Sequence, residues 1–449
     1  MRYGSPGPPR LAPAGACRGP IRRKRIINMQ DAERNREFCL YVVVIAATLV
    51  VWVNPLTIRL LPWVYGRTVY VTAFDALLLA SLTTALMHIR TRQAWLAWIS
   101  AAILLLVPLM LFSTELVIAD HLARTTSPGP DDYYIRNVHV PDADLGWRTV
   151  RTSTGEHFSR GNFSVRYQFD EAGRKIIIQP VPAPVTLHVF GDSFAFGHGV
   201  SNRDTALQIL ADRLAGRANV QNYAVMGYGL EQMFVRLYTS GNEIHPGDVV
   251  VFLPTAVDIE RNLIHKRYVC EMYYSAREQR AGMESISAFP VVDERGWHAV
   301  GLEEACGRVT GYLLFKSDLL FGSIYKLIWE RQTRERLREN GQNILDQARE
   351  FSESKGAAFL TVLVARPSEC IHKHQDVDWT WAGGAVIPLL RFCPSNAADV
   401  AQLRFPSDGH LSLAGNRWLA DSLYTVLRER GIVDGDRSDA RPGDGPRSR

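Results

Sequence analysis

The chain has 449 residues, of which 47% are hydrophobic and 22% are charged, and its formal net charge at pH 7 is +5. This length predicts at least two structural parts. The charge is modest and mostly local, so no nucleic-acid partner is expected. The first quarter is basic or continuously apolar, whereas the rest has the composition of an ordinary soluble domain.

Residues 1–37 are predicted to form a basic cytoplasmic N-terminus. Beside an apolar run, such a cluster indicates membrane topology rather than nucleic-acid binding. The basic residues just before that run are Arg18, Arg22, Arg23, Lys24, Arg25, Arg34 and Arg36.

Residues 38–117 are predicted to hold three transmembrane helices. The apolar runs 38–56, 70–89 and 94–112 are each long enough to cross about 30 Å of hydrocarbon. Arg90 and Arg92 lie in the link between the second and third runs, which places this link and the N-terminus in the cytoplasm. We therefore expect a multi-pass protein of the inner cell membrane whose C-terminal domain is extracytoplasmic, or periplasmic.

The cysteines agree with an external C-terminal domain. An even number there fits an oxidising compartment and up to two disulfides. Three pairings are possible, and we favour Cys270 with Cys306 and Cys370 with Cys393 because each pair brackets one local excursion. No close Cys-x-x-Cys or Cys-His spacing indicates zinc, so no metal is expected.

Residues 118–184 are expected to form a linker and a small lead-in segment with short strands. From 185 to 431, strand patterns alternate with helical ones, which predicts a parallel sheet covered on both faces. An insertion at about 260–311 should contain a hairpin with its turn at 293–296, and the tail 432–449 is predicted to be disordered. The expected strands are 185–190, 219–225, 247–254, 357–365 and 385–392, and the expected helices are 204–216 with Asp204 as N-cap, 229–241, 324–337, 342–354 and 412–431.

Functional groups of open α/β sheets lie beyond the carboxyl ends of the strands. After the first strand comes GDSFAFG, with Ser193 at the start of the next helix. A serine there either caps the helix or attacks as a nucleophile while its own backbone N–H helps to hold an oxyanion. After the second strand comes NYAVMGYG, in which Gly227 and Gly229 provide either a backbone N–H for the same crevice or a tight turn.

The stretch DGHLSLAG places Asp408 and His410 directly before the last helix. A carboxylate beside an imidazole fixes its tautomer and stabilises the cation formed when the ring takes a proton. Because this pair follows the last strand of a sheet whose first strand ends in Gly-Asp-Ser, we favour a functional role for it.

Together these motifs resemble those of the SGNH, or GDSL-type, hydrolase superfamily, over about residues 185–427. The resemblance implies a flavodoxin-like three-layer α/β/α parallel sheet. It also implies that Ser193 is the nucleophile, that His410 is its base supported by Asp408, and that the N–H groups of Ser193 and Gly227 bind the oxyanion. No cofactor is implied.

The third motif departs from the superfamily, which typically has Gly-x-Asn-Asp. This chain reads TAVD, so Val257 stands where the asparagine would complete the oxyanion hole and Asp258 matches the next residue. Losing one such donor costs about 10²–10³ in rate. Thr255 and Asn262 are the candidates for a replacement donor.

The sequence therefore predicts a membrane-anchored, extracytoplasmic serine esterase or O-acyltransferase that acts on acyl esters. Envelope or exported glycans are the first expected substrate class, and lipid esters are the second. The alternative is a catalytically weak SGNH module that serves as a glycan-binding or envelope-assembly protein. The sequence does not identify a protein partner.

Overall fold

The computed structural model describes residues 132–262, 270, 286–307, 320–372 and 386–433, with scattered residues between 83 and 119 and between 311 and 317. The basic N-terminus and most of the three predicted spans lie outside these residues. Within the described part of the chain, no helix is both long and apolar enough to cross a membrane. The chain divides into two compact units, Met1–Val117 with Asp318–Ser323, and Ile118–Ser317 with Ile324–Arg449.

A five-stranded parallel sheet forms the centre of the second unit, in the order β12-β11-β8-β6-β7. When the five strands are numbered in chain order and read from β7 to β12, they follow the flavodoxin-like order 2-1-3-4-5, as predicted. Leu187 of β6 pairs with Val249 of β8 on one side and with Val220 of β7 on the other. The strands are β6 (Thr186–Gly191), β7 (Asn219–Asn222), β8 (Val249–Leu253), β11 (Ala358–Leu363) and β12 (Val386–Pro388).

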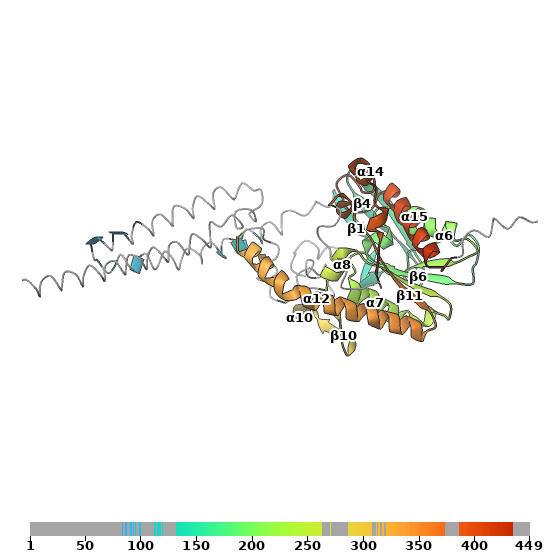
Figure 1. Ribbon diagram of the computed structural model, residues 1–449, viewed down its shortest axis with the longest axis horizontal. Coiled ribbons are helices and arrows are strands. Elements are labelled where there is room, and N and C mark those ends of the chain that lie inside the picture. Colours follow the sequence, from blue (N-terminus) through green and yellow to red (C-terminus); the bar gives the residue numbers. More distant parts are fainter. Residues whose placement is uncertain are drawn as a thin grey trace, which may run out of the picture. The chain divides into compact units, whose positions relative to one another are not determined.

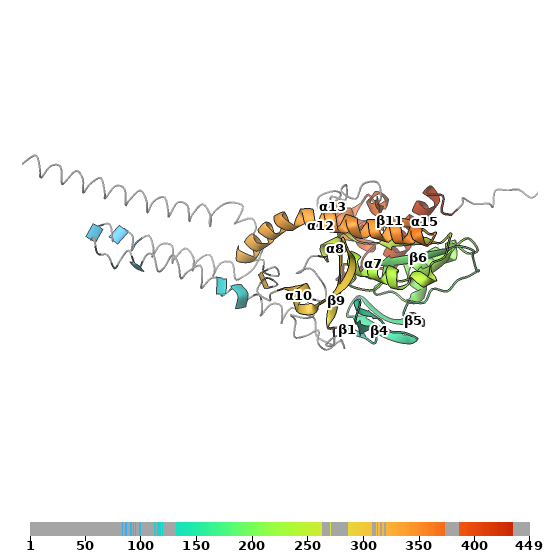
Figure 2. The same ribbon diagram turned by 90° about the horizontal axis from the view of Figure 1, so that it is seen from below.

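Helices cover both faces of this sheet (Figure 1, Figure 2). Because side chains of a strand alternate between faces, Val251 of β8 packs in the core of one face and Phe252 in the core of the other. The first face is covered by α6 (Ala206–Arg213) and α15 (Leu413–Glu429), and the second by α7 (Leu230–Thr239) and α12 (Leu320–Ser354).

One continuous helix, α12, replaces the two helices predicted at 324–337 and 342–354. The predicted break contains Gly341, but a glycine inside a helix costs only about 1 kcal/mol relative to alanine. The next turn buries Ile344 and Leu345 against the sheet, and this burial outweighs the local cost.

Two other predicted boundaries were wrong for local reasons. The N-cap of α6 is Thr205, whose Oγ1 accepts the Gln208 N–H at 3.1 Å, while Asp204 ends the preceding 3₁₀ turn η1 (Asn202–Asp204). The last strand ends at Pro388, where the chain enters the 3₁₀ helix η6 (Leu389–Phe392). Proline has no N–H to donate to a strand ladder, so β12 is shorter than the predicted strand 385–392.

The predicted lead-in segment contains two small antiparallel sheets. Tyr167 and Phe169 of the larger sheet lie in the main core, where the ring centroids of Tyr167 and Phe196 are 5.1 Å apart. This part of the chain therefore belongs to the folded domain. Its strands are β1 (Tyr133–Arg136), β4 (Ser153–Ser159) and β5 (Phe163–Phe169) in one sheet, and β2 (His139–Asp142) and β3 (Gly146–Thr149) in the other.

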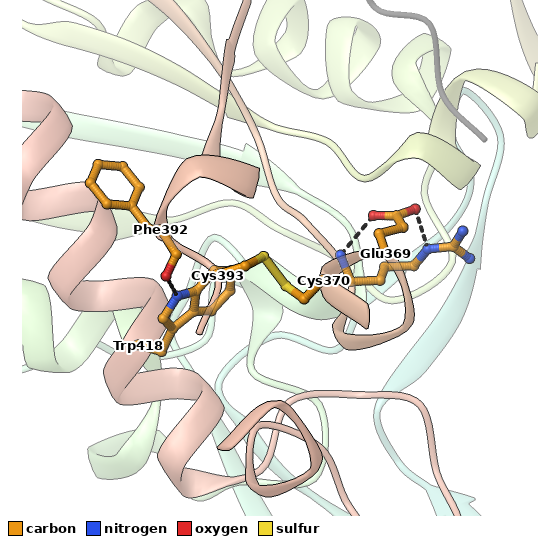
Figure 3. The surroundings of a disulfide bond; sticks show 6 residues. Glu369, Cys370, Phe392, Cys393 and Trp418 are labelled. Atoms are coloured by element: carbon orange, nitrogen blue, oxygen red, sulfur yellow. Dashed lines mark hydrogen bonds and ion pairs between the residues drawn. A yellow bond between two sulfur atoms is a disulfide. The ribbon is translucent and has the colours of Figure 1, made fainter. Parts of the chain in front are cut away.

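The predicted hairpin of the insertion is present as β9 (Ala288–Asp293) and β10 (Gly296–Gly301), followed by α10 (Leu302–Cys306). Both expected disulfides are confirmed, Cys270–Cys306 and Cys370–Cys393. The second joins α13 (Pro367–His372) to the residue after η6 (Figure 3). There the Trp418 indole N–H donates to the Phe392 carbonyl at 2.8 Å, which ties the bridge to α15. The remaining short elements are η2 (Gly241–Glu243) and α14 (Ala397–Gln402).

The packed domain extends past the boundary predicted for the disordered tail. Val433 is 3% exposed and packs in the same core as α15, with Ile432 beside it. The expected tail 432–449 therefore starts too early, and residues 434–449 lie outside the described part of the chain.

A stability prediction follows from Gly415 in α15, where an added Cβ would lie 2.1 Å from the Leu403 carbonyl oxygen. Gly415→Ala should lower the free energy of unfolding by about 1–3 kcal/mol through overpacking, although alanine is intrinsically the better helix former. The midpoint of the urea transition of the full chain measures this. Gly301→Ala is the control, because a Cβ there meets nothing within 4 Å. Equal midpoints for the two variants would contradict the predicted clash.

Candidate active site

The candidate site lies beyond the carboxyl ends of β6 and β8, where the strand order of the sheet reverses. Chains leave neighbouring strands in opposite directions at such a switch point, which opens a crevice. Ser193 follows β6, and Thr255 follows β8. The loop before α15 brings Asp408 and His410 to the same place, so the three residues predicted as a catalytic set are in contact.

The three side chains form one hydrogen-bonded series. Ser193 Oγ lies 2.8 Å from His410 Nε2, and His410 Nδ1 lies 2.5 Å from Asp408 Oδ1. An ionised carboxylate can only accept, so Nδ1 carries the ring proton and Nε2 is left to accept the proton of the serine hydroxyl. Asp408 Oδ1 also accepts the backbone N–H of His410 at 2.9 Å. This geometry suits a serine nucleophile with an oriented base.

The local sequence explains the position of Ser193. It begins the short helix α5 (Ser193–Phe196), whose N-cap is Asp192; Oδ1 of this aspartate accepts the Phe194 N–H at 2.8 Å. A Cβ on Gly191 would lie 2.5 Å from the Ala195 Cβ and 2.9 Å from the Leu253 carbonyl oxygen. Only glycine therefore allows the chain to turn this sharply between β6 and α5.

A tight loop holds Asp408 and His410. Arg404 and Leu411 form an antiparallel bridge at its base, and the Phe405 N–H donates to the His410 carbonyl at 3.1 Å. Outside this loop, Asn162 of the β4–β5 turn accepts from both the backbone N–H and the hydroxyl of Ser407, each at 3.0 Å. The lead-in sheet, as we call the sheet of β1, β4 and β5, thus helps to fix the loop.

Two backbone N–H groups are available for an oxyanion. Within the described residues, the N–H of Ser193 and the N–H of Gly227 have no hydrogen-bond acceptor. Gly227 has φ +84°, a conformation that strongly favours glycine. Unpaired donors beside a nucleophile are what stabilisation of a tetrahedral oxyanion requires.

A buried ion-pair network lies directly under Ser193. Arg261 Nη1 lies 3.3 Å from Asp192 Oδ2 and 2.5 Å from Asp258 Oδ1, and it donates to the Tyr228 carbonyl at 2.8 Å. One guanidinium therefore links the turn that carries Ser193 to the loop that carries Gly227. Burial and the charge of Asp192 raise the pKa of Asp258 well above its ordinary value, against the lowering effect of Arg261.

The residues of the third motif lie around this network. Thr255 caps α8 (Ala256–Glu260), and its hydroxyl lies 3.4 Å from Asp192 Oδ2, to which it donates. Val257, in the first turn of α8, offers no hydrogen-bond donor in its side chain. Asn262 is 8% exposed, and its Oδ1 lies 3.3 Å from where a Cβ on Gly229 would be. The Thr255 hydroxyl thus donates to Asp192, and Asn262 lies against the loop that contains Gly227 and Gly229.

His198, which is not among the residues predicted from the sequence, also lies in the site. Its Nε2 lies 3.4 Å from Asp408 Oδ2, and its ring stacks on His410 with centroids 3.7 Å apart and an interplanar angle of 10°. Burial alone raises the pKa of Asp408, but the contacts to His198 and His410 outweigh burial and lower it well below its ordinary value. The only sequence signal was a histidine between two glycines, five residues after Ser193.

His198, Asp408 and His410 are also the group of described residues closest to a metal-binding arrangement, with ligand atoms within 4.8 Å of one another. The two rings are stacked and nearly parallel. The lone pairs of imidazole nitrogens lie in the ring plane, so those of stacked rings do not converge on one ion as a tetrahedral site requires. This geometry fits a hydrogen-bonded carboxylate better than a metal centre.

No protein-family model and no curated protein matches this chain. Similar solved structures include the crystal structure of TesA, at 14% identity and a TM-score of 0.31, covering 54% of this chain and 98% of that one. A member of the lipolytic protein G-D-S-L family from Veillonella parvula is 13% identical with a TM-score of 0.29, over the same shares of 54% and 98%. A lipase from a goat rumen metagenome is 12% identical with a TM-score of 0.30, over 54% and 96%. At these values, neither a family nor an activity follows from the likeness.

Substitution of the two carboxylates that contact Arg261, Asp192 and Asp258, should affect the reactivity of Ser193 to different degrees. Asp258→Asn should slow acylation of Ser193 less, because Asp258 lies in α8 and not in the turn that carries Ser193, and because its raised pKa favours a neutral side chain. Asp192→Asn should slow acylation of Ser193 by about 10²-fold, because Asp192 caps the turn that carries Ser193 and a misplaced reacting group loses about that much. The rate of serine labelling by a fluorophosphonate measures both. Equal effects of the two variants would show that the network does not position the nucleophile.

Proposed function

We propose that this protein is a serine esterase or O-acyltransferase that acts on acyl esters. The hydrogen-bonded series from Ser193 through His410 to Asp408, beside two unpaired backbone N–H groups, carries this proposal. An imidazole held by a carboxylate on one nitrogen and by a serine hydroxyl on the other is the arrangement that activates the hydroxyl.

In the first half-reaction, Ser193 Oγ attacks the acyl carbon while its proton moves to His410 Nε2. Asp408 stabilises the imidazolium that results, and the N–H groups of Ser193 and Gly227 bind the oxyanion. Collapse of the tetrahedral intermediate breaks the bond to the leaving alcohol. The departing oxygen takes the proton from His410 Nε2, which leaves an ester of Ser193 and neutral His410.

In the second half-reaction, an oxygen nucleophile takes the place of the alcohol. His410 Nε2 accepts its proton as it attacks the acyl carbon, and the same proton returns to Ser193 Oγ when the acyl–enzyme bond breaks. With water as the nucleophile the products are a carboxylic acid and free enzyme. With a sugar hydroxyl, the acyl group is transferred.

We propose that the site is extracytoplasmic and that the chain is anchored in the inner membrane. The apolar runs, the basic residues before and between them, and an even set of external cysteines support this topology. The two disulfides of the described residues agree with an oxidising compartment. Such a location makes acylated envelope or exported glycans the first substrate class, with lipid esters second.

Ser193→Ala tests the enzyme directly. The full chain should be labelled by a fluorophosphonate and should hydrolyse p-nitrophenyl acetate. Ser193→Ala should lose all labelling and lower turnover by about 10³-fold or more, because it removes the nucleophile. Ser201→Ala is the matched control, since Ser201 Oγ only donates to Asp204 at 2.6 Å. The esterase proposal would be wrong if the wild-type protein were not labelled and if its turnover did not depend on Ser193.

Val257 favours a second candidate function, a catalytically weak module that binds glycan or organises an envelope assembly. Its side chain offers no hydrogen bond where the related motif has an asparagine, and the two unpaired N–H groups found among the described residues both belong to the backbone. The same experiment separates the candidates. A binding module predicts neither labelling nor serine-dependent turnover, together with glycan affinity that survives Ser193→Ala.

A fusion experiment tests the topology. Alkaline phosphatase, which requires an oxidising compartment, should be active when fused after Asp120, beyond the third predicted span. A fusion between the second and third spans, after Arg92, should be inactive and serves as the matched control. An inactive fusion after Asp120 would contradict the three-span topology.

A further inference from the structure

Asp408 contacts two histidines, one on each carboxylate oxygen. Oδ1 lies 2.5 Å from His410 Nδ1, and Oδ2 lies 3.4 Å from His198 Nε2. The two rings are parallel within 10° at 3.7 Å between centroids. His198 therefore touches both the carboxylate and the ring that this carboxylate orients.

The loop that carries His198 is held in place by other residues. Its two flanking glycines, Gly197 and Gly199, have φ +78° and +76°. The ammonium of Lys175 donates to the carbonyls of Gly197 and Val200 at 3.0 Å each, and the Gly199 N–H donates to the Tyr167 hydroxyl at 2.9 Å. Because these bonds fix the loop, replacing the His198 side chain should leave its backbone in place.

His198 connects the nucleophile segment to the base loop a second time. The first connection is the hydrogen bond from Ser193 to His410, and the second is the contact from His198 to Asp408. Two contacts between the same two segments fix their relative rotation as well as their distance. Only Gly409 separates Asp408 from His410, so the short loop itself offers few donors for the second carboxylate oxygen.

The groups facing His198 keep it neutral. Burial, followed by the nearby His410 and Lys175, lowers the pKa of His198 to about 3, against the raising effect of Asp408. The His157 ring, perpendicular to it at 4.4 Å, has its pKa lowered to about 2, first by burial. Burial also lowers the pKa of Lys175 well below its ordinary value.

Neutrality matters because His410 must become a cation during the reaction. A positive charge stacked on it at this distance would oppose that step. A neutral imidazole instead can turn one N–H toward Asp408 without adding charge.

We propose that His198 is a positioning residue for the esterase reaction: its Nε2 makes a polar contact with Asp408 Oδ2 at 3.4 Å, outside normal hydrogen-bond geometry, and its ring supports the His410 ring. It thereby keeps Oδ1 on His410 Nδ1 and aims His410 Nε2 at Ser193. This inference rests on the proposed function. A residue that only filled space would be replaceable by any flat side chain of similar size, so the polar contact and the packing can be separated by substitution.

Two variants separate these roles in the full chain. His198→Phe keeps a flat ring but removes the donor, whereas His198→Gln keeps a side-chain N–H donor and removes the ring. His245→Phe is the control, because His245 is exposed and lies outside the site. The measurements are kcat and KM for p-nitrophenyl acetate, the pH profile of kcat/KM, the fluorophosphonate labelling rate and the midpoint of thermal unfolding.

We expect His198→Phe to lower kcat and the labelling rate by about 10-fold, the lower end of the loss caused by removing a polar partner of a charged group. KM should stay within about threefold, because the His198 side chain is buried. Without this polar contact, the charge of Asp408 acts more strongly on protonated His410, so the acidic limb of the kcat/KM profile should move to higher pH. His198→Gln should retain most of the rate and the wild-type limb.

Three results would overturn the proposal: wild-type kinetics for His198→Phe, equal losses for the Phe and Gln variants, or an unshifted acidic limb in a slow Phe variant. Should the Phe variant not fold, as its unfolding midpoint would show, His198→Leu repeats the test with a smaller apolar side chain. Failure of the proposed function would look different, because the wild-type chain itself would then show no Ser193-dependent labelling.

Discussion

The hydrogen bond between Ser193 Oγ and His410 Nε2 joins residues 217 positions apart in the chain, and the order of the sheet makes it possible. Ser193 follows β6, which lies between β8 and β7 in the sheet, and His410 precedes α15, which packs with α6 on one face of the sheet. With β6 and β8 adjacent at the switch point, the chain leaves a crevice that both ends can reach. A different strand order would separate the two residues by one or more strand spacings of about 4.8 Å each.

The carboxylates around the site contact protein partners. Arg261 lies between Asp192 and Asp258, and Asp408 lies between two histidines. A buried carboxylate without a partner would cost several kcal/mol. Both arrangements also act across the chain, because the first ties the Ser193 turn to the glycine loop and the second ties the base loop to the nucleophile segment. Electrostatic compensation and positioning are thus performed by the same contacts.

Residues of the lead-in sheet, and Lys175 shortly after it, hold the two loops that carry His198 and Asp408. Tyr167 and Lys175 hold the loop around His198, and Asn162 holds the loop before Asp408. A Cβ on Gly199 would lie 2.6 Å from the Phe163 ring, so the two parts approach closely. This β structure precedes the main sheet in the chain. It nevertheless supports one loop that follows the first strand of that sheet and one that follows the last. The geometry of the candidate site therefore depends on it.

The sequence by itself determined the alternation of strands and helices, the hairpin at 293–296 and the three residues that meet at the switch point, and it favoured the cysteine pairing that the structure shows. These features rest on local periodicity and on short motifs, which a single sequence contains. The tertiary structure alone decided that α12 is continuous, because the burial of Ile344 and Leu345 outweighs the cost of Gly341. It also decided that His198 and Arg261 belong to the site. Their partners are Asp408, 210 positions away by residue number, and Asp192, 69 positions away, and contacts between such distant residues leave no pattern in the neighbouring sequence.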